Sequence, residues 1–383
     1  MVTPPILFSR PFRTADELKN LQVVLDSGHV HGDGPFTASA TARLRAISGA
    51  ERALLTTSCT HALEMASLLL RLAPGDEVIM PSFTFPSAAT AIALTGAVPV
   101  FVDVELSSGN IDATLIERAI TPRTKAISVV HYGGVAADME AILEIATRHG
   151  LPVIEDNAHA LGGTWRGRKL GTLGALGTQS FHDTKNVHCG EGGALLVNDP
   201  ALMDRAEMIR EKGTNRARFL RGQIDKYTWT DIGSSYLLSE LNAAVLDSQL
   251  ASFDDIQTRR HGVWNAYAAG LVDWAAEVGA SLMSPRPDAG HTAHLFYVQM
   301  PDHENQLGLL SHLRENGVVG TFHYIPLDSS PAGLHYGRTP FPCAVSEQFS
   351  RRLVRLPLWA GMSADDVARV IEVTASFRVG ARA

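Results

Sequence analysis

The sequence predicts an α/β fold, with a large domain on a mostly parallel, seven-stranded sheet and a smaller α+β domain at the C-terminal end. Between residues 51 and 199, short β-branched apolar runs alternate with longer stretches of helical spacing, which is the pattern of βαβ units. After residue 253 helical patterns mix with a few strand patterns, and the 383 residues exceed what one simple core usually holds. We expect a large domain at residues 1–252 and a small domain at residues 253–383, with the N-terminal segment as a candidate addition to the small domain.

Seven short apolar runs are the predicted strands of the large sheet. They are residues 53–57, 77–81, 98–104, 125–131, 152–156, 178–181 and 194–197. Two later runs, residues 295–299 and 319–324, are predicted strands of the small domain.

Two predicted helices beside these strands have recognisable ends. Asp138 is placed to cap one helix at its N-terminus, and Gly150 is placed to end it. Ser58 is placed to cap a second helix directly after the first strand, so that this helix points its free N–H groups above the sheet. The predicted buried stripes are Met139, Ile142, Leu143 and Ala146 in the first helix and Leu63, Ala66, Ser67 and Leu70 in the second.

The composition excludes several classes of partner. A formal net charge of -7 and a pI of about 6.1 provide no basic field for nucleic acid or an anionic membrane surface, so we expect neither. The three cysteines are too few and too scattered for a disulfide framework or for spaced zinc ligands. No run approaches the roughly 20 apolar residues of a membrane-spanning helix, and the first residues form no apolar leader. We therefore expect a soluble, unprocessed, cytoplasmic protein.

Ionisable residues stand where two strands of the sheet are predicted to end. Glu155 and Asp156 close the strand at 152–156, and Lys185 follows the strand at 178–181. In open α/β sheets, ligands bind at the carboxyl ends of the strands. A carboxylate and a lysine at this edge are the two groups that pyridoxal phosphate (PLP) requires, because the first keeps the ring nitrogen protonated and the second forms a Schiff base. Capping or ion-pairing carboxylates and a solvated lysine are the alternatives.

Four motifs follow one another around these residues. They are Glu-Asp-Asn-Ala-His-Ala at 155–160, Lys-Leu-Gly-Thr-Leu-Gly at 169–174, Ser-Phe-His-Asp-Thr-Lys-Asn at 180–186 and Gly-Glu-Gly-Gly at 190–193. The series resembles the DegT-type sugar aminotransferases, which have the aspartate-aminotransferase-like fold (PLP fold type I). The resemblance covers nearly the whole chain and implies PLP-dependent transamination of a nucleotide-linked keto-sugar.

Three further segments resemble one branch of that family, the dTDP-4-keto-6-deoxyglucose 4-aminotransferases of surface-polysaccharide and antibiotic-sugar pathways. They are Arg-Glu-Lys-Gly-Thr-Asn-Arg at 210–216, Gly-Gln-Ile-Asp-Lys-Tyr-Thr-Trp at 222–229 and Phe-His-Tyr-Ile-Pro-Leu at 322–327. The resemblance implies a dTDP-4-amino-4,6-dideoxyhexose product, with L-glutamate as amino donor and 2-oxoglutarate released. The nucleotide and the axial or equatorial position of the amine stay open.

Three other functions remain alternatives to this interpretation. The first is a sugar 3-aminotransferase. The second is a PLP-dependent sugar dehydratase, although such enzymes carry histidine where this chain has Lys185. The third is a non-catalytic regulatory protein that only binds PLP.

The resemblance assigns roles to four residues around the cofactor ring. It makes Lys185 the residue that carries PLP as an internal aldimine and Asp156 the partner of the pyridinium nitrogen. Burial beside that cation is expected to lower the pKa of Asp156, and desolvation to lower the pKa of the lysine imine. His159 stands near the cofactor's 3-oxygen, where many relatives have glutamine, and Phe85 matches the aromatic residue that stacks on the ring. A core histidine and plain core packing are the alternatives.

Phosphate is expected at the N-terminus of the second helix, because free N–H groups and the helix dipole favour an anion there. The chain has Ser-Cys-Thr-His at 58–61 where the family usually has Ser-Gly-Thr. Cys59, Thr60 and His61 are the candidate contacts, together with the hydroxyl of Ser180. Ser235 stands where relatives commonly supply an asparagine from the partner subunit.

Residues 210–226 concentrate six basic side chains in an otherwise acidic protein. Such a run is usually a solvated face, but a nucleotide diphosphate also needs cations. We expect part of it to contact the substrate across the interface of a homodimer with the active site at that interface. The candidate substrate residues are Lys226, Tyr227, His323 and Tyr324.

Two weaker patterns carry no function in this interpretation. Residues 167–174 resemble a nucleotide-binding loop, but no helix follows them, so we expect a hairpin. The pairs His29 with His31 and His182 with His188 lack acidic or cysteine ligands at metal spacing, so no metal site is expected.

Overall fold

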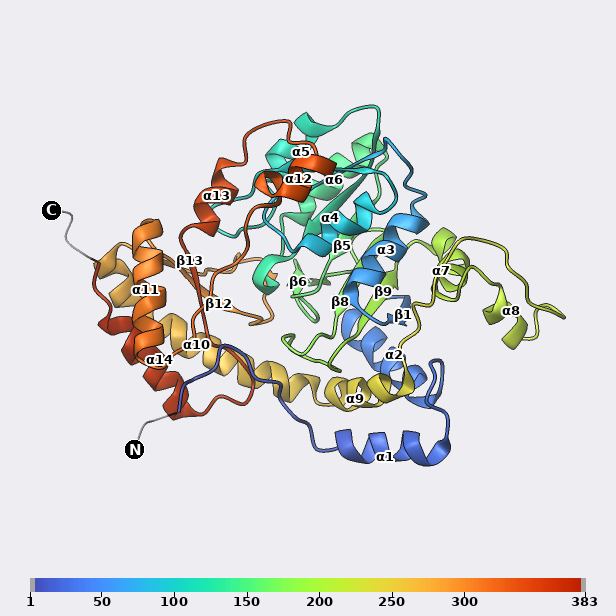
Figure 1. The fold of residues 1–383 in the computed structure, drawn as a ribbon, viewed down its shortest axis with the longest axis horizontal. Helices are drawn as coiled ribbons and strands as arrows, with labels where there is room; N and C mark the ends of the chain where they lie inside the picture. The colour runs from blue at the N-terminus through green and yellow to red at the C-terminus, as the bar shows by residue number, and fades with distance from the viewer. Residues whose placement is uncertain (1–3, 380–383) are drawn as a thin grey trace.

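The computed structural model describes residues 4–379, which form an α/β structure around one large sheet (Figure 1). Six strands of this sheet run in the same direction, and β9 is antiparallel to both of its neighbours. All seven predicted strands are confirmed, with ends shifted by at most two residues. In sheet order they are β1 (Arg52–Thr56), β9 (Gly193–Val197), β8 (Leu176–Ser180), β5 (Val153–Asp156), β4 (Thr124–Val130), β2 (Glu77–Pro81) and β3 (Val98–Val102).

Helices cover both faces of the sheet, because successive side chains of each buried strand point to opposite faces. On β1, Leu54 packs into one hydrophobic cluster and Leu55 into another. One face is covered by α3 (Cys59–Leu69), α4 (Pro86–Ala93) and α7 (Met203–Arg210). The other is covered by α2 (Pro35–Ser48), α5 (Ala113–Ala119), α6 (Met139–His149) and α9 (Glu240–Ala251).

The two predicted helix boundaries are confirmed. Asp138 accepts a hydrogen bond from the N–H of Ala141 at the start of α6, and Gly150 ends that helix with a φ of 63°. Ser58 accepts from the N–H of His61 at the start of α3.

The predicted buried stripes need two corrections. Leu143 is only half-buried, and Ile145 takes its place against the sheet, because a helix with 3.6 residues per turn brings this position under the strands. Leu70 is also half-buried, since α3 ends at Leu69.

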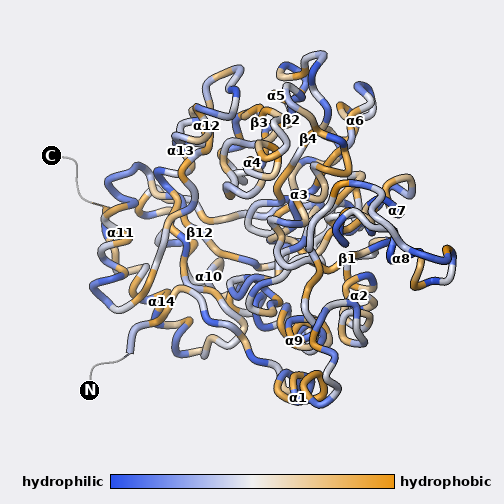
Figure 2. The backbone as a smooth tube through the Cα atoms, turned by 45° about the vertical axis from the view of Figure 1, so that its right-hand side comes forward, coloured by the Kyte–Doolittle hydropathy of each residue, from blue (hydrophilic) through white to orange (hydrophobic). Residues whose placement is uncertain are grey.

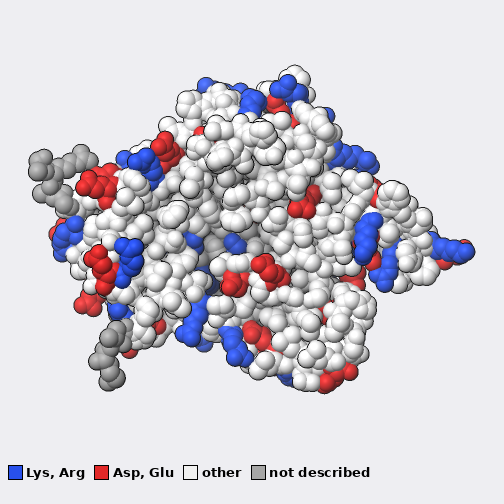
Figure 3. All heavy atoms as spheres, in the orientation of Figure 1, with Lys and Arg blue, Asp and Glu red and all other residues white. Residues whose placement is uncertain are grey.

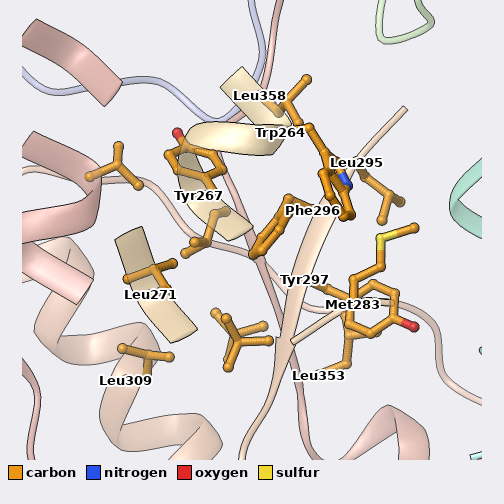
Figure 4. Packing of buried hydrophobic residues seen from close by; sticks show 14 of the residues in the cluster. Trp264, Tyr267, Leu271, Met283, Leu295, Phe296, Tyr297, Leu309, Leu353 and Leu358 are labelled. Atoms are coloured by element: carbon orange, nitrogen blue, oxygen red, sulfur yellow. The ribbon is translucent and has the colours of Figure 1, made fainter. Parts of the chain in front are cut away.

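The C-terminal part packs on a second, smaller sheet. Its strands are β10 (Ser281–Leu282), β12 (Phe296–Gln299) and β13 (Leu353–Leu356), and its helices are α10 (Phe253–Val278), α11 (His303–Glu315) and α14 (Ala364–Ser376). Figure 4 shows Trp264, Tyr267 and Leu271 of α10 packed against Phe296 of β12. Ile6 joins the same cluster. The proposed domain boundary after residue 252 falls between α9 and α10, and it stays a prediction.

The predicted strand at 319–324 is wrong. In this segment only Thr321 pairs with a strand, through an isolated bridge to Arg355 of β13. The chain then leaves the sheet edge, and the N–H of Leu327 donates to the carbonyl of Ser82 at 2.9 Å. The segment therefore becomes an irregular wall between the two parts of the molecule.

The remaining elements are short or peripheral. The hairpin expected at 167–174 lies slightly earlier, in β6 (Thr164–Trp165) and β7 (Arg168–Lys169), whose turn contains Gly167 with a φ of 77°. Strand β11 (Ala289–Gly290) joins these two in a third small sheet. Helix α1 (Glu17–Ser27) packs on α9, and α12 (Pro331–Tyr336) and α13 (Ala344–Ser350) lie in the C-terminal part. The 3-10 helices are η1 (Tyr132–Gly134), η2 (Pro200–Leu202) and η3 (Leu327–Ser329).

One segment projects from the rest of the molecule. We call residues 211–235, which include α8 (Arg216–Leu220), the arm, and Figure 1 shows it extending beyond α7. Most of its large apolar side chains are exposed, with Trp229 at 76%.

Candidate active site

A cavity of about 450 Å³ opens at the carboxyl ends of β5 and β8. Figure 3 shows a hollow in the middle of one face of the molecule, with Lys or Arg atoms inside it. The walls come from both parts of the chain, including Asp156 and Lys185 from the large sheet and His294 and Tyr324 from the C-terminal part. This position agrees with the rule that ligands of open α/β sheets bind at the carboxyl ends of the strands.

Lys185 and Asp156, the two groups predicted from strand ends, line this one cavity. Burial lowers the pKa of the Lys185 amine to about 8, and the low pKa expected for the imine of this lysine stays a prediction. In the protein chain itself, burial raises the pKa of the Asp156 carboxyl group, and the lowering expected beside a pyridinium cation stays a prediction. The N–H of Ala158 and the charge of Lys185 act the other way but are weaker than desolvation.

The neighbouring Glu155 explains the motif at 169–174. Its buried carboxylate accepts hydrogen bonds from the N–H groups of Gly171 at 2.8 Å, Leu173 at 2.7 Å and Gly174 at 2.6 Å. It also contacts Nε2 of His131 at 2.9 Å. Such a carboxylate, satisfied by four donors, fixes the loop beside β5 and thereby the strand end that carries Asp156.

The predicted phosphate site is the N-terminus of α3, which packs closely against β9. The α3 residues Cys59 and Thr60 line the cavity, and so does Ser180 from the end of β8. A Cβ atom on Gly193 would lie 2.3 Å from the carbonyl carbon of Ser58 and 2.4 Å from the nitrogen of Cys59. Only glycine allows this approach, so β9 sets the position of the N–H groups that face the cavity.

His61 does not line the cavity, although it follows Thr60 directly. Its Nδ1 contacts the hydroxyl of Thr57, and its ring lies 5.0 Å from that of Tyr236. The turn of α3 thus carries the ring away from the cavity, while the N–H of His61 donates to the Ser58 hydroxyl at 3.1 Å. The contact of His61 with the cofactor phosphate stays a prediction.

Two histidines stack at the other end of the cavity. The rings of His159 and His294 lie 4.2 Å apart. Nδ1 of His159 accepts from the N–H of Gly133 at 3.2 Å, and burial beside Lys185 and His323 lowers its pKa. The ring is therefore neutral, with its proton on Nε2, a donor that Gly133 leaves free.

Phe85 is 54% exposed and lines the cavity, so core packing is not its role. Its ring lies 6.0 Å from that of Tyr324, one of the two predicted substrate residues at the cavity wall. His323 is the other.

The remaining predicted contacts lie outside the cavity of this chain. Lys226, Tyr227 and Ser235 are exposed on the arm. Their predicted roles depend on a second subunit and stay predictions.

Arg355, His294 and Phe8 also line the cavity, and sequence analysis missed all three. The signal for Arg355 was a single charged residue within the apolar run Leu-Val-Arg-Leu-Pro-Leu at 353–358. Within residues 4–379 no group of side chains has the composition of a metal site, and no helix there is long and apolar enough to cross a membrane.

Comparison with known proteins identifies the family of the chain. The model of the DegT/DnrJ/EryC1/StrS aminotransferase family matches residues 11–374. The chain belongs to this family. This aminotransferase is 34% identical over 386 residues to the spore coat polysaccharide biosynthesis protein SpsC of Bacillus subtilis (strain 168), across 98% of this chain and 97% of SpsC.

Two solved structures are similar over almost the whole aminotransferase. The aminotransferase TlmJ from Streptoalloteichus hindustanus has 31% identity and a TM-score of 0.89, with 97% of this chain and 98% of TlmJ covered. DesV from S. venezuelae, in complex with a ketimine intermediate, has 34% identity and a TM-score of 0.88, with 99% of this chain and 100% of DesV covered. The protein is therefore a PLP-dependent sugar aminotransferase of fold type I.

Proposed function

We propose that this enzyme moves an amino group from L-glutamate to C4 of dTDP-4-keto-6-deoxyglucose, which gives a dTDP-4-amino-4,6-dideoxyhexose and 2-oxoglutarate. The branch-specific segments at 210–216, 222–229 and 322–327 support this sugar. We further propose that the enzyme works in the cytoplasm as a homodimer in which the arm of each subunit completes the site of the other.

One observation carries the proposal: a single cavity joins a desolvated lysine, a buried carboxylate and the N-terminus of a helix, and this donor set fits PLP. When bound, PLP supplies an electron sink for the carbon that loses its proton. Lys185 would hold it covalently and Asp156 would pair with its ring nitrogen. The N–H groups of Cys59 and Thr60, with the hydroxyl of Ser180, would hold its phosphate.

Each side chain around the cofactor would have its own role in the reaction. The amine of Lys185 would take the proton from the glutamate Cα and would later give one to the sugar carbon. Its lowered pKa makes the neutral, basic amine available at a lower pH than in a solvated lysine. Asp156 gains most from a cation at the ring nitrogen, because burial penalises its unpaired charge. Nε2–H of His159 would donate to the 3-oxygen of the cofactor, and Phe85 would cover the ring.

Absorption spectroscopy tests the attachment at Lys185. The purified holoenzyme should show a visible band that bleaches with glutamate, and the Lys185→Ala variant should lack it. A band that survives in this variant would place the cofactor on another residue.

Product analysis tests the substrate. Incubation with dTDP-4-keto-6-deoxyglucose and glutamate should yield a 4-amino sugar, and ring couplings in the NMR spectrum will distinguish axial from equatorial amine. Loss of a hydroxyl without gain of nitrogen would indicate a dehydratase instead, and absence of turnover on any 4-keto sugar would refute the choice of substrate.

A further inference from the structure

Arg355 is a cation in the cavity that lacks an acidic partner. Among residues 4–379, no Asp or Glu forms an ion pair with it. Its guanidinium lies over the ring of Phe8, 4.5 Å from the ring centre. Its Nε is buried and has no hydrogen-bond partner. A half-buried guanidinium in this state has an unused capacity to bind an anion.

The charges around the cavity do not supply that anion. Lys185 and Arg355 are the cations of its wall, and Asp156 is the buried carboxylate. Glu191 also lines the cavity, but it is exposed and lies 3.7 Å from Nε2 of His182. Behind the wall, Arg260 donates only to backbone carbonyl oxygens, including that of His294 at 2.5 Å. The cavity wall thus favours an incoming anion.

His323 is the only hydrogen-bond acceptor of the Arg355 guanidinium among the described residues. Nε2 of His323 accepts from Nη1 of Arg355, and Nδ1 lies 3.1 Å from the hydroxyl of Tyr132. Burial and the charge of Arg355 lower the pKa of His323, so the ring is neutral and can accept at one nitrogen while donating at the other. This acceptor is uncharged, so a carboxylate will outcompete it for the guanidinium.

The two substrates of a transamination differ in the charge of the groups on their reacting carbon. The reacting carbon of an amino acid donor bears a carboxylate, whereas the reacting carbon of a keto-sugar bears only neutral groups. Both carbons must approach Lys185, and Arg355 is close enough for its charge to act on that amine. The same cavity must therefore bind a carboxylate beside the reacting carbon in one half-reaction. In the other half-reaction it must bind a substrate that has no anion there.

We propose that Arg355 binds the α-carboxylate of the amino donor, and that His323 takes over the guanidinium when the uncharged sugar occupies the same space. The inference rests on the proposed function for the identity of the two substrates. Arg355 is then a donor-binding residue, and the Arg355–His323 contact is the device by which one site accepts both substrates.

Calorimetric titration of the holoenzyme with glutarate, an unreactive dicarboxylate, tests the first half of the inference. Arg355→Met should weaken binding by about 30-fold or more, because it removes one partner of a buried charge pair. Arg355→Lys should recover part of the affinity. The control Arg351→Met alters an exposed arginine and should bind like the wild type. Equal binding by Arg355→Met and wild type overturns the inference alone, and a wild type that binds no dicarboxylate overturns both it and glutamate as donor.

Single-turnover kinetics with the keto-sugar test the second half. His323→Phe should slow the sugar half-reaction several-fold, while glutarate binds as tightly as before or more tightly, because no contact must be broken. A merely structural role would weaken both steps. In an Arg355→Met background the same substitution should have little further effect. An equal loss in both backgrounds would show that His323 acts independently of Arg355.

Discussion

Lys185 and Asp156 are the two central residues of the cavity. Burial raises the free energy of the charged form of each. The pKa of Lys185 is lowered and that of Asp156 is raised, so each is costly to keep ionised without a partner. Such sites trade stability for function. The lowered pKa of Lys185 therefore predicts that the free energy of unfolding depends on pH.

For Lys185 the folded pKa is about 8 and the reference value is 10.5, so the unfolded chain binds more protons between these two values. The free energy of unfolding of the cofactor-free protein should therefore rise with pH across that window. Lys185→Met should be more stable than wild type by about 3 kcal/mol at pH 7, with the difference vanishing above about pH 10.5.

Urea unfolding of the cofactor-free proteins between pH 7 and 11 measures this difference. Lys125→Met, which alters an exposed lysine on β4, is the control and should leave the profile unchanged. A constant difference between Lys185→Met and wild type at all pH values would contradict the linkage.

Residues beside a local signal could be placed in the cavity from the sequence. Asp156 ends a strand, and Cys59 begins a helix, and both lie where those signals predict. His61 could not, because a helix start predicts where N–H groups point but not where a side chain two positions later turns. Arg355 could not either, because its approach to Lys185 depends on how two distant parts of the chain pack.

At the level of elements, the antiparallel strand β9 connects two sides of the cavity. Strand β9 lies between β1 and β8, so it joins the strand that precedes the proposed phosphate-binding turn to the strand that precedes Lys185. Gly193 at its start is the point of closest approach to that turn. Hydrophobic alternation predicts such strands well, but it does not predict their partners. This explains why residues 319–324 have the composition of a strand but pair with β13 only at Thr321.

Gly193→Ala should push Ser58 and Cys59 away from β9, because the added Cβ has no room. We expect the dissociation constant of PLP to rise roughly 10-fold or more, since small displacements of positioned donors are costly. Fluorescence titration of the cofactor-free protein measures it. Gly262→Ala on α10 is the matched control, since a Cβ there meets nothing within 4 Å. Unchanged PLP affinity in Gly193→Ala would show that β9 does not set this turn.

At the level of the whole molecule, apolar residues lie exposed on two peripheral elements. The arm exposes Trp229 at 76% and Tyr227 at 52%, and α1 exposes Leu18 at 66%. Figure 2 shows α1 at the edge of the structure, with hydrophobic residues among hydrophilic ones. Exposed apolar surfaces of this kind mark contacts with other proteins, which agrees with the proposed homodimer.

Trp229→Ser should raise the dissociation constant of the dimer by about 30-fold, because buried aromatic anchors contribute most to interfaces. Sedimentation velocity over a range of concentrations measures this. Val272→Ser, which changes a similarly exposed apolar residue on α10, should leave the association unchanged. A wild type that is monomeric at all concentrations would refute the dimer and the role proposed for the arm.

The position of β9 in the sheet also constrains how the protein is made. Strand β1 pairs only with β9 in the large sheet, although a long stretch of chain separates them. During synthesis, β1 therefore leaves the ribosome well before β9 has been made. Until β9 pairs with it, the apolar side chains of β1 stay exposed or are protected by chaperones. Capture of vitamin B6 at the proposed site is thus expected late, in chains whose synthesis has passed Val197.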